Sequence, residues 1–174
     1  MTNLKGKNAI ITGSTSGIGF GLAKGMADAG MNIVMNGLES ADDVSDKIEE
    51  LESKGVKVLY DGADMTKPDE ITALVENAHK EFGSVDVVVN NAGIQKVSAV
   101  EDMPPETYER IIAINLNSAF YTTRIAVPMM KKQGWGRIIN IASAHGLVAS
   151  PFKATYVAAK HGIVGFTKAI ALEL

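Results

Sequence analysis

The sequence contains no cysteine, which excludes disulfide bonds, thiol catalysis and thiolate metal sites. It also contains no run of about 18 apolar residues, the length that a membrane-spanning helix needs, and no apolar leader before its first predicted strand. It has no basic run and a net charge of −3, so its charge does not indicate a surface that binds nucleic acid. From these absences we expect a cytoplasmic protein without membrane or nucleic-acid partners.

The 174 residues are enough for one domain with a hydrophobic core, and 46% of them are hydrophobic. Short apolar stretches alternate with longer amphipathic ones. The apolar stretches predict five buried strands, at 8–12, 32–36, 56–60, 85–89 and 137–142. Periodicity and capping residues predict helices that end near 29, span about 40–51, 68–82 and 106–132, and begin again near 155.

Strand and helix alternate five times, and nearly continuous apolar strands indicate a parallel sheet covered on both faces. Right-handed crossovers make a doubly wound, Rossmann-like sheet the natural arrangement for such a chain. No linker interrupts the pattern, so we expect a single α/β domain over 1–174. The last stretch, HGIVGFTKAIALEL, is helical and apolar to its end, which leads us to expect that the C-terminal part of the domain is missing.

A glycine-rich turn, TGSTSGIG, joins the first predicted strand to the first helix. Glycines let a backbone approach a pyrophosphate, and a helix N-terminus offers free N–H groups. The spacing differs from G-x-G-x-x-G, and such glycines can simply form a tight turn. Their place after the first strand favours an adenine nucleotide or dinucleotide, and the lack of G-K-[ST] argues against a P-loop. The candidate cofactor contacts here are Gly13, Thr15, Ser16, Gly17, Ile18 and Gly19.

The second strand ends in MNGLES, where a dinucleotide site usually has an acid for the ribose. Asn36 can hydrogen-bond a ribose, although it is not an acid. Neither this stretch nor the glycine-rich turn offers an Arg or Lys to a 2′-phosphate, so NAD is favoured over NADP. Glu39 either assists the ribose contact or is an ordinary surface residue.

Polar residues follow the next two strands. Asp64 and Met65 come after the third strand, and the NNAG motif with Asn90, Ala92 and Gly93 follows the fourth. Each group has a structural alternative, since an acid can cap a helix and asparagine is common in turns. The carboxyl ends of parallel strands share one sheet edge, where ligands bind, so we predict cofactor contacts for all five.

Tyr156 and Lys160 are four residues apart in a predicted helix and therefore share a face. A nearby ammonium lowers the pKa of a tyrosine from about 10 and makes it a usable general acid and base. Ser143, after the fifth strand, can donate to a developing alkoxide. Asn115 lies inside a predicted helix, where propensity does not favour an amide. A Tyr-x-x-x-Lys pair alone is usually an ordinary surface pattern, but the upstream motifs favour a catalytic set.

TGSTSGIG, NNAG, Asn115, Ser143 and YVAAK together resemble the short-chain dehydrogenase/reductase family along the whole chain. The resemblance implies that Tyr156 is the acid and base and that Ser143 polarises the substrate oxygen. It implies that Lys160 lowers the tyrosine pKa and binds the nicotinamide ribose. It further implies that Asn115 holds a proton-relay water and that Asn90 helps to seat the cofactor.

A finer resemblance is to the bacterial D-3-hydroxybutyrate dehydrogenases, through VLYDGAD, NNAGIQ, GRIINIASAHGLVAS and YVAAKHG. It implies NAD as the cofactor, reversible oxidation of D-3-hydroxybutyrate to acetoacetate in ketone body metabolism, and a homotetramer. In that family a glutamine, a histidine and a lysine hold the substrate carboxylate, and the matching positions are Gln95, His145 and Lys153. A fixed cation at Lys153 suits a small hydroxy or keto acid, although a loop lysine can also be merely solvated.

Two alternative functions remain open: an NADP-linked 3-oxoacyl reductase of the same superfamily, and a dinucleotide-binding fragment without turnover. Members of the resembled family continue with further strands and a substrate lid, so we expect this chain alone to be a weak or inactive catalyst. The missing strands also put the tetramer in doubt. His79, His145 and His161 lack a spacing typical of zinc sites, so no metal is expected.

Overall fold

Five parallel strands form one sheet, in the order β3-β2-β1-β4-β5, in a computed structural model that describes residues 3–174. The strands are β1 (Asn8–Ile11), β2 (Asn32–Asn36), β3 (Val58–Asp61), β4 (Val87–Asn90) and β5 (Arg137–Asn140). The strand order changes direction between β1 and β4, and such a switch point is where open α/β sheets bind ligands. The predicted doubly wound fold is confirmed.

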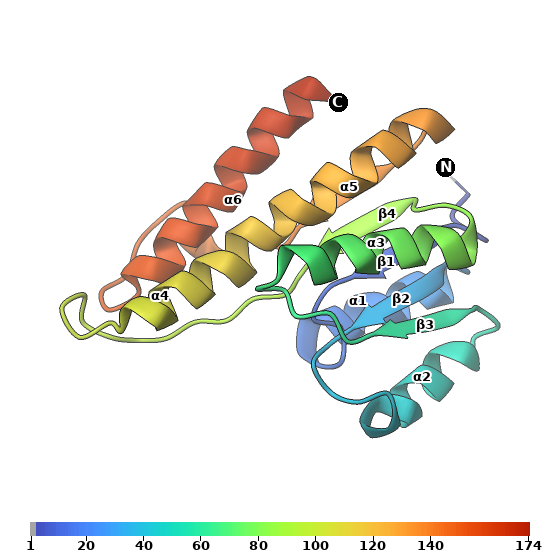
Figure 1. Ribbon diagram of the computed structural model, residues 1–174, viewed down its shortest axis with the longest axis horizontal. Helices are drawn as coiled ribbons and strands as arrows, with labels where there is room; N and C mark the ends of the chain where they lie inside the picture. The colour runs from blue at the N-terminus through green and yellow to red at the C-terminus, as the bar shows by residue number, and fades with distance from the viewer. Residues whose placement is uncertain (1–2) are drawn as a thin grey trace.

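Helices cover both faces of this sheet (Figure 1). On one face Ile10 of β1 packs with the cores of α3 and α5, and on the other Ala9 and Ile11 pack with α1 and α2. This alternation follows from the two-residue period of a strand. The helices are α1 (Gly17–Asp28), α2 (Ser45–Glu52), α3 (Pro68–Phe82), α4 (Pro105–Ile112), α5 (Ser118–Gln133) and α6 (Ala154–Glu173).

The predicted helix over 106–132 is divided in the structure. α4 and α5 are separated by a π-helical turn at Ala113–Asn117, where the helix widens by one residue per turn. The prediction missed this turn because the apolar residues on its two sides were assigned to a single α-helix, without the one-residue insertion that a π-turn makes. The helix predicted from residue 40 begins later, since a 3₁₀ turn at Asp42–Val44 precedes α2.

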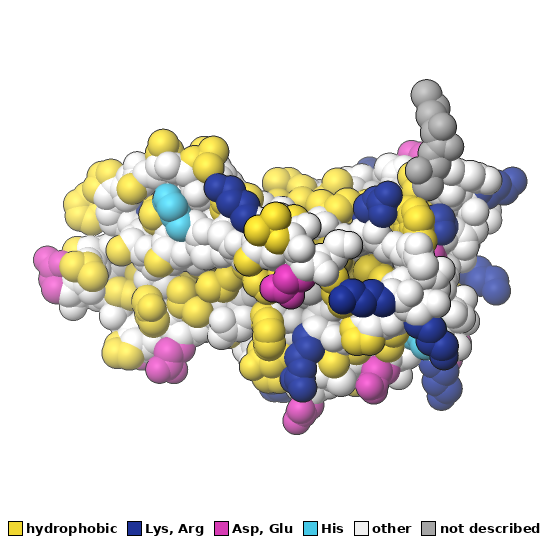
Figure 2. Space-filling view, turned by 90° about the horizontal axis from the view of Figure 1, so that it is seen from above, with side chains coloured by type: hydrophobic (Ala, Val, Ile, Leu, Met, Phe, Trp, Pro, Cys, Tyr) yellow, Lys and Arg dark blue, Asp and Glu magenta, His cyan; other side chains and the backbone are white. Residues whose placement is uncertain are grey.

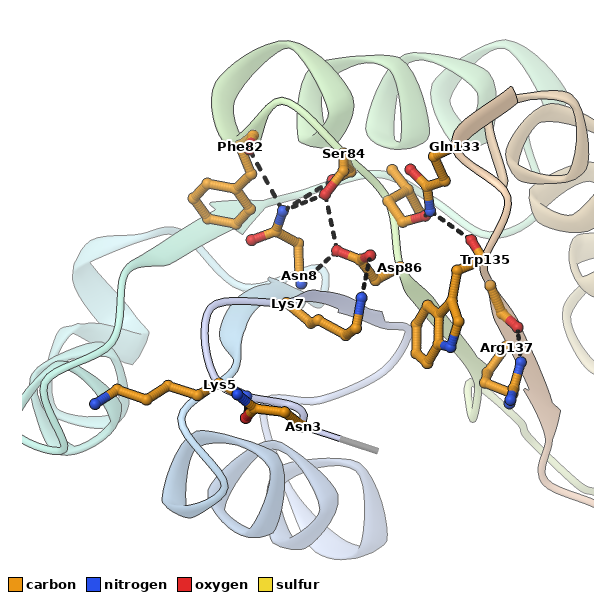
Figure 3. Close-up of polar contacts among 12 residues, drawn as sticks. Asn3, Lys5, Lys7, Asn8, Phe82, Ser84, Asp86, Gln133, Trp135 and Arg137 are labelled. Atoms are coloured by element: carbon orange, nitrogen blue, oxygen red, sulfur yellow. Dashed lines mark hydrogen bonds and ion pairs between the residues drawn. The ribbon is translucent and has the colours of Figure 1, made fainter. Parts of the chain in front are cut away.

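A polar cluster ties together the amino ends of β1, β4 and β5 (Figure 3). The Asp86 carboxylate, 6% exposed, accepts hydrogen bonds from the Lys7 ammonium at 3.2 Å, the Asn8 backbone N–H at 2.9 Å and the Ser84 hydroxyl at 2.8 Å. The Lys7 ammonium also lies 3.9 Å from the centre of the Trp135 ring. A buried carboxylate with three donors holds the strand starts in register, opposite the ligand-binding edge.

Replacing Asp86 with alanine should lower the free energy of unfolding by about 2 kcal/mol, because hydrogen bonds to a charged group are lost and buried donors are left unpaired. Urea denaturation measures the change. Asp28→Ala is the matched control, since the ion pair between Asp28 and Lys54 is exposed and such pairs contribute at most about 1 kcal/mol. Equal losses in the two variants would contradict a structural role for the cluster.

The two loops that precede α4 and α6 lie side by side at the end of the molecule away from β3. The Ser98 backbone N–H donates to the Phe152 carbonyl oxygen at 2.9 Å. Figure 2 shows hydrophobic side chains gathered over this half of the molecule, while most lysines and arginines lie over the other half. Val97, Leu147 and Phe152 are among the exposed apolar residues of the loops. Within residues 3–174, no helix is both long and apolar enough to cross a membrane.

Candidate functional site

A groove of about 820 Å³ runs along the carboxyl edge of the sheet. It is lined by the segments that follow each of the five strands and by side chains of α4 and α6. The lining residues are Gly13 with 15–19, 36–39, 63–65, 91–95 and 141–142, together with Arg110, Ile114, Tyr156 and Lys160. Its volume lies within the usual range for small-molecule sites, and it spans the switch point between β1 and β4.

The glycine-rich turn forms one wall of the groove, and its glycines are required either by their backbone angles or by lack of space. Gly13 and Gly17 have φ angles of 59° and 53°, in the left-handed region that favours glycine. A Cβ on Gly19 would overlap the Gly13 carbonyl oxygen and lie 2.5 Å from Asn91 Nδ2. Ser16 is the N-cap of α1 but makes no side-chain capping bond, so the N–H groups of the first turn keep their capacity to bind an anion. Thr15 and Ile18 also line the groove, and these features fit a pyrophosphate.

Asn36 lines the groove and was predicted to hydrogen-bond a ribose, and this contact stays a prediction. The Asn36 side chain is buried, with Oδ1 accepting from the Gly13 N–H at 3.1 Å. Its Nδ2 donates to the carbonyl oxygens of Asp61 at 3.0 Å and Ala63 at 2.9 Å. Both amide protons are therefore used inside the protein, and Asn36 fixes the glycine-rich turn against β3.

Glu39 places a carboxylate beside the glycine-rich turn, just past the end of β2. Its Oε1 accepts a hydrogen bond from the Thr15 hydroxyl at 3.0 Å, and the residue lines the groove. Gly37 allows this approach, because a Cβ there would lie 2.5 Å from both Glu39 Oε2 and Thr15 Cγ2. From the sequence alone, Glu39 could be either a ribose contact or an ordinary surface residue. The spacing of the residues does not predict that Glu39 contacts Thr15.

The two asparagines of NNAG have different surroundings. Asn90 Oδ1 accepts from the Thr122 hydroxyl at 2.7 Å, and its Nδ2 donates to Asn140 Oδ1 at 2.8 Å. The side chain thus joins β4 to α5 and β5, and the predicted role of Asn90 in seating the cofactor stays a prediction. No cofactor contact was predicted for Asn91. It nevertheless lines the groove and donates from Nδ2 to the Gly13 carbonyl oxygen at 2.9 Å. Ala92 and Gly93 line the groove, as predicted for a cofactor wall.

Asn115 lies in the π-helical turn and clamps the loop after β4. Its Oδ1 accepts from the Ile94 N–H at 2.8 Å, and its Nδ2 donates to the Ile94 carbonyl oxygen at 2.9 Å. This contact explains why an amide occurs inside a helix despite its low propensity. The predicted proton-relay water at Asn115 stays a prediction.

Asp64 both forms a turn and lines the groove. Its Oδ1 accepts from the backbone N–H and the hydroxyl of Thr66, each at 2.8 Å, and these bonds hold the pKa of the Asp64 carboxyl below its usual range. Met65 is buried beside it in the groove wall. Arg110 of α4 lines the groove and lowers the same pKa through its charge. No sequence signal pointed to Arg110, because its position depends on how α4 is placed over the sheet.

Tyr156 and Lys160 lie together in the groove, as their spacing in α6 predicts. The Lys160 ammonium is 5.7 Å from the centre of the Tyr156 ring and donates to the Ile141 carbonyl oxygen at 2.7 Å. Lys160 is only 4% exposed, and burial lowers the pKa of its ammonium. Displaced pKa values cluster at functional sites, so the buried lysine beside a groove-lining tyrosine makes this part of the groove the candidate site of the chemistry.

This burial gives Lys160 a measurable effect on stability. The folded pKa lies below the unfolded value near 10.5, so the folded chain bears a penalty while Lys160 is charged in both states. The penalty disappears as the pH rises through the folded pKa towards 10.5. We expect wild-type stability to rise relative to Lys160→Met over this interval, as measured by urea denaturation at a series of pH values. A difference that is independent of pH would contradict the burial effect, and Lys24→Met, on the surface, is the control.

The residues predicted to hold a substrate carboxylate are only partly brought together. His145, in a 3₁₀ turn at Ala144–Gly146, has its ring centre 5.9 Å from that of Tyr156, and its Nδ1 lies 3.5 Å from Ser143 Oγ. Gln95 lines the groove from the loop after β4. Lys153 is half-buried just before α6, and its ammonium forms no ion pair within the described residues, 3–174.

The remaining histidines lie elsewhere. His161 is exposed, with Nδ1 3.0 Å from the Val157 carbonyl oxygen, and His79 is in α3. Across the part of the chain that the structure describes, no group of three His, Asp or Glu side chains could hold a metal ion.

Relatives of known name match nearly the whole chain. D-beta-hydroxybutyrate dehydrogenases of Cupriavidus necator and Rhizobium meliloti are 58% and 57% identical to it over 170 residues. A 3-oxoacyl-[acyl-carrier-protein] reductase of Staphylococcus epidermidis is 38% identical over 168 residues, covering 97% of this chain and 69% of the reductase. The first two matches cover 98% and 97% of this chain and 66% of each relative, so the chain spans about two thirds of their length.

A solved structure also matches nearly the whole chain. A putative short-chain alcohol dehydrogenase from Sinorhizobium meliloti superposes with a TM-score of 0.94 at 27% identity, over 98% of this chain and 68% of the other. The family model for short chain dehydrogenase matches residues 7–174. The glycine-rich turn, the Tyr156–Lys160 pair and these matches together show that the chain belongs to the short-chain dehydrogenase family.

Proposed function

We propose that the protein interconverts D-3-hydroxybutyrate and acetoacetate with NAD as the cofactor. The observation that carries this proposal is the pairing of Tyr156 with Lys160 in the groove, with His145 beside the Tyr156 ring and Ser143 beside His145. The names of the relatives that are 58% and 57% identical support the substrate.

The groove suits a nicotinamide dinucleotide. The first turn of α1 would hold the pyrophosphate, with Gly13, Gly17 and Gly19 allowing close backbone approach. The Glu39 carboxylate beside Thr15 would repel a 2′-phosphate at the end of β2, which favours NAD over NADP. Asp64 and Met65 would form the opposite wall.

The reaction needs a proton acceptor and a donor to the substrate oxygen, and these side chains provide both. A bound nicotinamide would supply the acceptor for the hydride that leaves the alcohol carbon. Tyr156 takes the hydroxyl proton of the alcohol, and the Lys160 ammonium lies 5.7 Å from the centre of its ring. Ser143 donates to the same oxygen as it becomes a carbonyl. Lys153 offers a cation to the substrate carboxylate.

Turnover and cofactor binding test the proposal separately. NADH and NADPH are titrated against the chain by nicotinamide fluorescence, and NADH should bind at least about tenfold more tightly, in line with one unfavourable charge contact. Oxidation of D- and L-3-hydroxybutyrate is assayed with this chain and with a chimera that carries the C-terminal third of the Cupriavidus necator relative. Tighter binding of NADPH, with reduction of a 3-oxoacyl thioester instead, would favour the reductase alternative that the Staphylococcus relative suggests.

Lys153→Ala should raise the KM for D-3-hydroxybutyrate by about 10- to 100-fold and change kcat little, because one charge-assisted contact with the carboxylate is worth roughly 1.5–3 kcal/mol. Steady-state kinetics of the chimera measure this. Lys96→Ala, an exposed lysine in the loop after β4, is the control and should change neither constant. A fall in kcat at unchanged KM would contradict a binding role for Lys153.

We also propose that the protein forms a homotetramer. Support comes from Tyr108, Phe120 and Leu172, which are large hydrophobic residues exposed on α4, α5 and α6. Light scattering of the chain and of the chimera measures the mass directly, and monomers in both would contradict the proposal.

A further inference from the structure

Ser150 is a polar residue that the function described above leaves without a role. It lies in the loop between β5 and α6, and its Oγ is 2.9 Å from Nε2 of His145. No other hydrogen bond of its hydroxyl is recorded within residues 3–174. Either the Ser150 hydroxyl donates to Nε2 or an Nε2–H donates to the hydroxyl, according to the tautomer of His145.

The other side of the His145 ring faces Ser143. The Ser143 Oγ already accepts a hydrogen bond from the His145 backbone N–H at 3.2 Å, and His145 Nδ1 is 3.5 Å away. Hydrogen bonds at catalytic groups are often long in a free enzyme and shorten when substrate binds. Ser150, His145 and Ser143 thus form a hydroxyl–imidazole–hydroxyl chain. It ends at Ser143, the residue that the proposed function assigns to the substrate oxygen.

A neutral imidazole carries one proton, so the partner of Nε2 decides what Nδ1 offers. When the Ser150 hydroxyl donates to Nε2, the ring proton lies on Nδ1 and points to Ser143. The Ser143 oxygen then accepts from two N–H groups, which fill both of its lone pairs. Its own proton can then only be donated to a third group, such as a substrate oxygen. With the opposite tautomer, Nδ1 would accept the Ser143 proton and turn it away from the substrate.

We propose that Ser150 is a positioning residue that fixes the Nδ1–H tautomer of His145 and thereby makes Ser143 a hydrogen-bond donor to the substrate oxygen. The proposal deepens the proposed dehydrogenase function and rests on it for its catalytic part. The tautomer itself is a property of the free chain and is tested without turnover.

The loop geometry supports a fixed place for Ser150. Two residues later, Phe152 has a φ angle of 62°, which is unusual for a residue with a side chain. The Ser98 N–H holds the Phe152 carbonyl oxygen at 2.9 Å. The backbone on the C-terminal side of Ser150 is thus tied to the loop after β4, which limits the positions that its hydroxyl can take.

The test is the nitrogen NMR spectrum of the chain labelled with ¹⁵N-histidine, at about pH 8, where an unperturbed imidazole is neutral. The chain has three histidines, and His145→Gln identifies the signals of His145. His161 is an internal reference, since its Nδ1 must carry a proton to donate to the Val157 carbonyl oxygen. We expect a protonated Nδ1 and an unprotonated Nε2 for His145, a shift towards Nε2–H in Ser150→Ala, and the wild-type pattern in Ser150→Thr.

Kinetics of the chimera provide the second measurement. Ser150→Ala should lower kcat by about tenfold with little change in KM, because it misdirects a donor whose complete loss costs on the order of 10²–10³ in rate. Ser150→Thr should keep kcat near wild type. A protonated Nε2 in the wild type, or the same tautomer in wild type and Ser150→Ala, would overturn the proposal. The expected tautomers without any turnover would support the positioning role and contradict the proposed function instead.

Discussion

Replacing Tyr156 with phenylalanine should lower the rate of D-3-hydroxybutyrate oxidation by about 10³-fold, the middle of the range for loss of a general acid and base. The substitution removes one oxygen and leaves the aromatic ring beside His145 and Lys160. The substrate proton then has no acceptor, while the walls of the groove are unchanged. Assays of the chimera should show the fall in kcat, and fluorescence titration should show unchanged NADH binding.

The same chemical change elsewhere is the control for this prediction. Tyr108 lies on α4, is 48% exposed and does not line the groove, so Tyr108→Phe should retain full activity. A Tyr156→Phe variant that keeps more than about a tenth of the wild-type rate would contradict the assignment of Tyr156, because even weak acid–base catalysis contributes about 10²-fold.

The sequence predicted the sheet and the groove well because local rules determine them. Short, β-branched apolar runs such as VDVVV favour strands buried on both faces, and Gly83, with a φ angle of 79°, ends α3 where the pattern places it. Strand ends of a parallel sheet share an edge, so Asp64, Ala92 and Tyr156 were correctly expected in one groove.

The direction of individual amide side chains could not be predicted in this way. Asn36 and Asn90 are at the predicted places in the chain, yet both use their amides inside the protein. An amide binds a ribose or a backbone carbonyl equally well, and only the positions of Ala63 and Asn140 decide between them. For Glu39 the sequence predicted no definite contact, whereas the structure places its carboxylate against Thr15. This contact depends on the shape of a turn that the sequence does not specify.

Replacing Gly19 with alanine should weaken NADH binding by about 5- to 150-fold, since overpacking costs about 1–3 kcal/mol and each 1.4 kcal/mol is a factor of ten. The new Cβ would overlap the Gly13 carbonyl oxygen and crowd Ser14 Cα at 2.9 Å and Asn91 Nδ2 at 2.5 Å. Two of these atoms are backbone, so the turn itself has to move. Its movement displaces the N–H groups at the start of α1 from the place where a pyrophosphate would lie. Fluorescence titration of the chain with NADH measures the loss without needing turnover.

Gly21→Ala, two residues further along α1, is the control for the general effect of an alanine in this helix. No atom lies within 4 Å of a Cβ built on Gly21, so Gly21→Ala should leave NADH binding unchanged and stabilise the chain by up to about 1 kcal/mol. Gly19→Ala gains the same helix propensity, and a lower stability than wild type in urea would therefore report the crowding alone. If the two variants bind NADH equally well, the glycine-rich turn does not approach the cofactor as closely as the proposed function requires.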